Sequence, residues 1–185
     1  MRKTWVINLI GGPGVGKTTS AALLFGQLKV EFPGIVTEYV QEYAKKLVWI
    51  KDYEALNMQY SVTLKQYKLL KQINGQVDFI ITDGPLIQGL FYNKYNNENT
   101  SDVSKTEALV LKTFNEFNNI NIFLTRGDFE YEEEGRTQTE SEAIKVDDIL
   151  KEMLVNANIN FKIFKSDPNN IPEMIQYIFQ IVGEN

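Results

Sequence analysis

The sequence contains neither cysteine nor histidine. Their absence excludes disulfides, zinc sites built from these residues, cysteine nucleophiles and histidine general bases. Any acid–base chemistry must therefore use Asp, Glu, Lys or Tyr. No apolar run approaches the roughly 20 residues needed to cross a membrane. The apolar stretch 5–10 behind the basic N-terminus is also too short for the core of a signal peptide. We therefore expect a cytoplasmic protein with no membrane partner.

Arginine is scarce, and the charge is unevenly distributed. Three arginines, Arg2, Arg126 and Arg136, stand against 16 lysines. The formal net charge is −5, but residues 128–152 alone hold ten acidic and three basic side chains. The rest of the chain is therefore slightly basic. The overall acidity argues against a dedicated nucleic-acid binder, although a local basic groove would be enough for one.

The clearest motif lies near the N-terminus. Residues 5–10 are apolar and partly β-branched, as in a buried strand, and apolar residues at helical spacing follow from position 21. Between them the P-loop pattern G-x-x-x-x-G-K-[ST] is complete and is followed by a second threonine: Gly11, Gly12, Pro13, Gly14, Val15, Gly16, Lys17, Thr18 and Thr19. The glycines let backbone N–H groups converge on phosphate oxygens. Lys17 can reach the β- and γ-phosphates, and the Thr18 hydroxyl can ligate Mg²⁺. The motif predicts binding of a nucleoside triphosphate with Mg²⁺.

The elements that we expect alternate between strands and helices. The strands are predicted at 5–10, 35–37, 77–82, 121–125 and 160–164, and the later helices at 38–49, 53–73, 86–95, 101–117, 138–154 and 168–182. This order predicts an α/β fold of the P-loop NTPase type, with a doubly wound five-stranded parallel sheet covered by helices on both faces. Ligands bind such sheets at the carboxyl ends of the strands. We expect one domain over 1–185.

Two acidic residues follow predicted strands. Asp83 directly follows 77–82, the Walker-B arrangement, where a carboxylate can hold the Mg²⁺ shell or position the nucleophile. Capping of the next helix ahead of Pro85 would also explain it. Glu38 is a candidate acceptor for the proton of an attacking hydroxyl, with Glu42 one turn further along the predicted helix. An ordinary acid in a first helical turn would explain Glu38 equally well. Either Glu38 or Asp83 is expected to be the base.

Arg126 and Arg136 bracket an acidic loop, 127–135. A guanidinium group matches the geometry of phosphate oxygens. We therefore interpret about 126–137 as a lid that closes over the triphosphate, excludes water and brings arginine to the transferring group. Alternatively, the two arginines neutralise nearby carboxylates.

An acceptor pocket is expected to include Tyr39, Tyr43 and Gln59, because aromatic rings stack on bases and an amide can read a polar edge. Core packing is the alternative for the two tyrosines. A further set shares one face of the helix predicted at 53–73, where we expect solvent exposure and, alternatively, contact with nucleic acid: Lys65, Lys68 and Lys71.

Four segments carry a family resemblance: GGPGVGKTT, TEYVQEYAKKLVW, VDFIITDGPL and FLTRGDFEYEEEGRTQTESEA. Together they resemble the P-loop kinase-like family typified by the nicotinamide riboside kinase domain of NadR-type proteins, and most of all its small bacteriophage members. The resemblance implies ATP and Mg²⁺ as cofactors, with phosphate passed to an alcohol on a nucleoside-like acceptor. Some phage members phosphorylate the hydroxymethyl group of 5-hydroxymethyluracil within DNA. Modified DNA is therefore a candidate acceptor, and a host cytoplasm the location.

The leading hypothesis is a kinase in which Lys17, Arg126 and Arg136 neutralise charge on the moving phosphoryl group. A small nucleoside or nucleotide is the alternative acceptor to modified DNA. From another class, an NTPase switch that needs no acceptor would use the same P-loop, as would a nucleotide-binding regulator without turnover.

Overall fold

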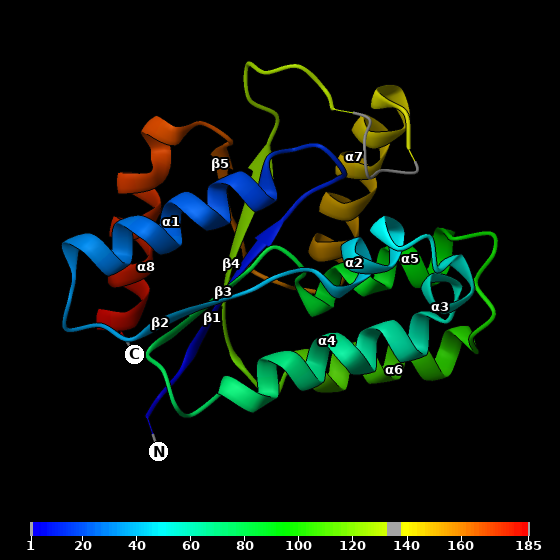
Figure 1. The fold of residues 1–185 in the computed structure, drawn as a ribbon, viewed down its shortest axis with the longest axis horizontal. Coiled ribbons are helices and arrows are strands. Elements are labelled where there is room, and N and C mark those ends of the chain that lie inside the picture. The colour runs from blue at the N-terminus through cyan, green and yellow to red at the C-terminus, as the bar shows by residue number, and fades with distance from the viewer. Residues whose placement is uncertain (1, 133–137, 185) are drawn as a thin grey trace.

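The computed structural model describes residues 2–132 and 138–184. Strands and helices alternate along this part of the chain (Figure 1). In order they are β1 (Trp5–Ile10), α1 (Lys17–Glu31), β2 (Thr37–Val40), α2 (Tyr43–Trp49), α3 (Tyr53–Asn57), α4 (Gln59–Ile73), β3 (Phe79–Thr82), η1 (Leu86–Gln88), α5 (Gly89–Tyr95), α6 (Val103–Phe114), β4 (Asn118–Thr125), α7 (Glu140–Asn156), β5 (Lys162–Lys165), η2 (Pro168–Asn170) and α8 (Ile171–Gly183). None of the described helices is both long and apolar enough to cross a membrane.

The five strands form one parallel sheet in the order β2-β3-β1-β4-β5. This arrangement confirms the predicted α/β fold of the P-loop NTPase type. The first strand lies in the middle of the sheet, so the loop that follows it opens at the point where the strand order reverses. Asn8 pairs with Thr82, which brings Asp83 beside the start of the P-loop.

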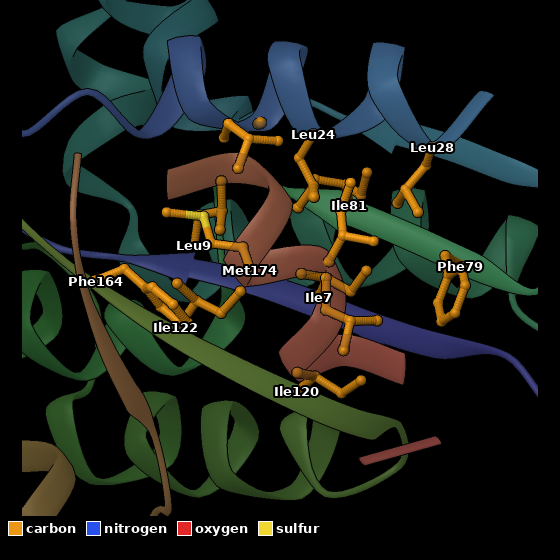
Figure 2. Packing of buried hydrophobic residues seen from close by; sticks show 14 of the residues in the cluster. Ile7, Leu9, Leu24, Leu28, Phe79, Ile81, Ile120, Ile122, Phe164 and Met174 are labelled. Carbon is orange, nitrogen blue, oxygen red and sulfur yellow. The ribbon is translucent and has the colours of Figure 1, made fainter. Parts of the chain in front are cut away.

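Helices cover both faces of the sheet (Figure 1). Ile7 and Leu9 of β1 point to the face covered by α1 and α8, where they pack with Leu24, Leu28 and Met174 (Figure 2). The alternate residues of β1 point to the other face and pack with buried residues of α4 to α7. Because β1 is buried on both faces, its sequence is apolar on both faces rather than alternating, except for Asn8, whose buried amide donates to Asn119 and Asn121. A buried side chain of this size contributes about 1.5–3 kcal/mol, which holds the loop after β1 on a rigid support.

Two predicted elements differ from the structure near the site. Strand β2 extends to Val40, where it pairs with Thr82, so α2 begins at Tyr43 and not at Glu38. The single helix predicted over 53–73 is broken at Met58, whose ψ of 71° is not helical. At the break, the carbonyl oxygen of Asn57 accepts a hydrogen bond from the N–H of Thr100 at 3.0 Å, a contact with a distant segment of the chain.

Candidate functional site

The P-loop has a backbone that only glycine adopts easily. Gly14 and Gly16 have φ angles of +71° and +91°, in the left-handed region. A side chain at these positions would collide with Tyr131 and Ser166, respectively. Helix α1 begins at Lys17 with no side-chain cap, so the N–H groups of its first turn have no partner within the helix. Those donors and the positive end of the helix dipole fit a phosphate group.

Lys17 folds back over the loop that precedes it. Its Nζ donates to the carbonyl oxygens of Gly11 at 2.7 Å and Gly12 at 3.0 Å. Burial lowers the pKa of the Lys17 ammonium, while the carboxylates of Glu42 and Asp83 act in the opposite direction. The cation is therefore placed in the P-loop among acidic groups.

Thr18 and Asp83 form a pair of oxygen ligands beside the loop. The Thr18 hydroxyl donates to Asp83 Oδ2 at 2.6 Å, and Asp83 Oδ1 accepts the backbone N–H of Glu42 at 2.9 Å. Mg²⁺ is typically bound by one or two protein oxygens plus phosphate oxygens and water. The two side chains fit that role. Among the described residues no cluster of three carboxylates could hold a metal alone, so phosphates would complete the shell.

Glu42, and not Glu38, lies with these groups. Because β2 extends to Val40, Glu38 is an exposed residue of this edge strand, 3.8 Å from Lys29 Nζ. The prediction that Glu38 accepts the proton of the attacking hydroxyl is thus corrected, because its side chain does not lie at the phosphate end of the site. Glu42 precedes α2 and lines the cleft, and burial raises the pKa of its carboxyl, with Lys17 opposing that change.

A cleft of about 1120 Å³ runs from the P-loop to the far ends of α2 and α5. Its phosphate end includes Pro13, Lys17, Thr18 and Thr19, whereas Val15 is buried in the core. Its far end is lined mainly by amide and aromatic side chains, among them Trp49, Tyr53, Gln59, Tyr95 and Asn96. The cleft therefore has a charged end and a largely uncharged one.

Of the three predicted acceptor residues, the structure brings one to the cleft. Gln59 is buried and lines it. The Tyr39 ring lies 6.4 Å from the ring of Phe25, packs against the core under α1 and does not line the cleft. Its hydroxyl nevertheless lies close to Asp83 and Thr18, and burial, with Asp83 acting in the same direction, raises its pKa. The backbone N–H of Tyr43 donates to Gln66 Oε1 at 2.8 Å, and Tyr43 is not among the described residues that line the cleft.

Lys45 is a cleft residue that the sequence reasoning missed. Its Nζ lies 3.3 Å from Thr18 Oγ1, so it adds a second cation to the phosphate end. Lys45 is three residues after Glu42, the residue that precedes α2, and both side chains line the cleft. That spacing was the available signal, but it could be used only with the correct start of α2.

The predicted lid lies partly within the described residues. Arg126 Nη2 donates to the carbonyl oxygen of Pro13 at 3.0 Å, and Arg126 Nε lies 2.9 Å from Asp147 Oδ2. Tyr131 packs against Gly14. Arg136 and the rest of 133–137 lie outside the described residues, and its predicted role stays a prediction.

The family described as AAA domain matches residues 6–170. Among solved structures, a thymidylate kinase from Ehrlichia chaffeensis is similar with a TM-score of 0.62 and 16% identity, over 95% of this chain and 98% of that chain. A deoxyadenosine kinase from M. mycoides, with the products dCMP and dCDP, has a TM-score of 0.59 and 19% identity, over 97% and 100%. The NadR protein, in complex with NAD and AMP-PNP, has a TM-score of 0.61 and 16% identity, over 95% of this chain and 49% of NadR. Among proteins of curated function, none matches this chain in sequence. These similarities show the fold.

Proposed function

This chain belongs to the AAA-domain family, and we propose that it is a kinase that transfers the γ-phosphate of ATP to a hydroxyl of a nucleoside-type acceptor. The observation that carries the proposal is Glu42, a carboxylate on the wall of the same cleft as Lys17 and Thr18. A nucleotide switch that has no acceptor needs only the phosphate end of such a cleft. A base beside that end, facing a large compartment in which an acceptor could bind, is what transfer to an alcohol requires.

The phosphate end would bind ATP through the loop Gly11–Thr18, with Thr19 beside it. Lys17 would balance charge on the β- and γ-phosphates, and Thr18 with Asp83 would hold Mg²⁺. When bound, the ion would supply positive charge to the phosphate oxygens. Asp83 is buried beside Thr18 and is not among the described residues that line the cleft where an acceptor would bind, so we assign Asp83 to the metal shell and not to proton transfer.

Glu42 would accept the proton of the acceptor hydroxyl. At the same time the hydroxyl oxygen would bond to the γ-phosphorus, and the bond between the γ-phosphorus and the leaving ADP would break. A base works best when its pKa lies near the working pH. Burial raises the pKa of the Glu42 carboxyl toward that range. Lys45, 3.3 Å from Thr18 Oγ1, would stabilise charge on the transferring group.

The charge distribution in the cleft favours an uncharged acceptor. Among the described residues that line it, the cations are Lys17 and Lys45, both at the phosphate end. The far compartment offers amides and aromatic rings, which hydrogen-bond and stack on a base, and an acid, Glu98. Nucleoside monophosphates and DNA strands need cations for their own phosphates. A base in DNA would also have to be extruded from its stack to reach this compartment. We therefore favour a free nucleoside over 5-hydroxymethyluracil in DNA.

The test follows transfer of labelled γ-phosphate from ATP to one base in three contexts. The acceptors are 5-hydroxymethyl-2′-deoxyuridine as the free nucleoside, its 5′-monophosphate, and the same base in duplex DNA, with other nucleosides and nicotinamide riboside in parallel. Label in a free nucleoside is the expected result. Label confined to DNA would establish the phage-type acceptor instead. Phosphate released in every reaction without a labelled acceptor would favour an NTPase switch.

Two matched variants connect this assay to the site. Glu42→Gln should lower the transfer rate by about 10²–10⁴-fold, the usual contribution of a general base. Glu38→Gln should leave the rate unchanged, because Glu38 is exposed on the edge strand. Equal effects of the two substitutions would remove Glu42 from its proposed role. Lys17→Ala should abolish transfer.

A further inference from the structure

Helix α7 contacts the P-loop through the side chain of Asp147. Asp147 Oδ1 accepts the N–H of Gly12 at 2.6 Å, and Oδ2 lies 2.9 Å from Arg126 Nε. Arg126 in turn donates through Nη2 to the carbonyl oxygen of Pro13 at 3.0 Å. Two adjacent residues of the P-loop are thus held by an acid and a base that come from separate elements.

This contact is close and has rigid support. A Cβ atom on Gly12 would meet both the Asp147 carboxylate and the carbonyl oxygen of Ala143, 2.8 Å away. The backbone of α7 therefore lies directly against the loop, and only glycine permits that approach. Next to Asp147 along α7, Val146 and Leu150 are buried in the core. The position of Asp147 is consequently fixed by packing and not by the ion pair alone.

An isolated carboxylate at this place would work against the site. It lies beside the loop that would receive a triphosphate, and like charges repel. The guanidinium of Arg126 offsets that charge, and the partners of the pair on the loop are backbone groups of its first half. On the loop, Asp147 and Arg126 use the N–H of Gly12 and the carbonyl oxygen of Pro13, and so do not compete with phosphate for the N–H groups after Pro13.

We propose that Asp147 is a positioning residue: together with Arg126 it holds Gly12 and Pro13 so that the P-loop keeps the shape that accepts the phosphates of ATP. The proposal rests on the ATP binding proposed above. It also gives Arg126 a different part from the one predicted, because Arg126 acts on the loop and not on the transferring group.

Binding of ATP by the intact protein, measured by calorimetry without any acceptor, tests the proposal. Asp147→Ala should weaken ATP affinity by about tenfold, within the range of coupling between contacting residues. Asp147→Asn should lose less, because its amide oxygen can still accept the Gly12 N–H. Asp148→Ala is the matched control, since Asp148 is the exposed neighbour on the same helix, and its affinity should be unchanged.

The double variant Asp147→Ala/Arg126→Ala should bind ATP no more weakly than the worse of its two single variants, because the two residues act as one unit. Unchanged or tighter binding by Asp147→Ala would overturn the proposal, since tighter binding is what relief of simple repulsion would produce. Thermal melts of each variant without ATP separate a general loss of stability from a specific change in the P-loop. If Asp147→Ala does not fold, Asp147→Asn keeps the test valid. Failure of the proposed ATP binding itself is distinguishable, because then the unsubstituted protein would give no binding signal.

Discussion

The carboxylate of Glu42 would serve the proposed reaction, but its burial lowers the stability of the folded protein at neutral pH. Its carboxyl is partly buried between Lys17, Asp83 and Lys45, and burial is the largest influence on its pKa, which is raised. A raised carboxyl pKa means that the folded protein binds this proton more tightly than the unfolded chain does. The stability contributed by the protonated form is therefore present below the ordinary pKa of 4.5 and is lost as the pH rises through the folded-state value.

Glu42→Gln should for this reason melt at a higher temperature than the unsubstituted protein at pH 7. Glutamine imitates the protonated carboxyl and cannot ionise, so the difference should shrink as the pH falls through the raised folded-state pKa of Glu42 toward 4.5, below which the carboxyl is protonated in both the folded and the unfolded protein. Thermal midpoints from pH 4 to pH 8 measure this difference. Glu38→Gln, at an exposed position, should show none. A variant that is less stable than its parent at pH 7 would contradict the assigned direction of the pKa shift.

At the level of elements, the start of α2 decides which side chains reach the cleft. Strand β2 holds the chain extended to Val40 through pairing with Thr82. Helix α2 then begins at Tyr43, with Lys45 directed to the phosphate end and Lys46 exposed. The predicted helix from residue 38 placed Glu38 in the first turn instead. That prediction was wrong because the β-branched and aromatic residues of TEYV favour a strand over a helix.

Lys45 and Lys46 offer a matched pair on this helix. Lys45→Met should lower kcat by about 10²-fold, as loss of one preorganised charge does, and should change KM for ATP much less. Lys46→Met removes the same charge from an exposed position and should leave both parameters unchanged. Steady-state kinetics with the acceptor found above measure the effect, and Lys45→Arg should recover part of the rate. If the two methionine variants behaved alike, Lys45 would have no direct part in transfer.

For the whole molecule, strand order is what assembles the site. The order β2-β3-β1-β4-β5 places the ends of β2 and β3 next to the P-loop after β1. Glu42 and Asp83 are hydrogen-bonded although 41 positions separate them, and Gly12 and Asp147 although 135 do. A ligand bound across such contacts should stabilise the fold as a unit.

ATP with Mg²⁺ should accordingly raise the unfolding midpoint of the protein. A ligand at 100 times its dissociation constant stabilises the native state by about 2.7 kcal/mol through mass action. Lys17→Ala should lose most of this shift, because it removes the cation from the P-loop. Lys162→Ala, at an exposed position in β5, should keep it. Thermal melts with and without ATP·Mg²⁺ give the comparison, and an equal shift in both variants would place nucleotide binding elsewhere.

The sequence by itself determined the P-loop, the Asp83 position after a buried strand, and the five-stranded α/β fold. These follow from contiguous motifs and local hydrophobic periodicity, which do not depend on how distant elements meet. The tertiary structure decided that Glu42 and Lys45 line the cleft, that Gln59 does so without Tyr39 or Tyr43, and that Asp147 and Arg126 hold the P-loop. Each of these depends on where a strand ends or how a helix is rotated against its neighbour. Such registers are set by packing between elements far apart in the chain, and a shift of one or two residues changes which side chain reaches the site.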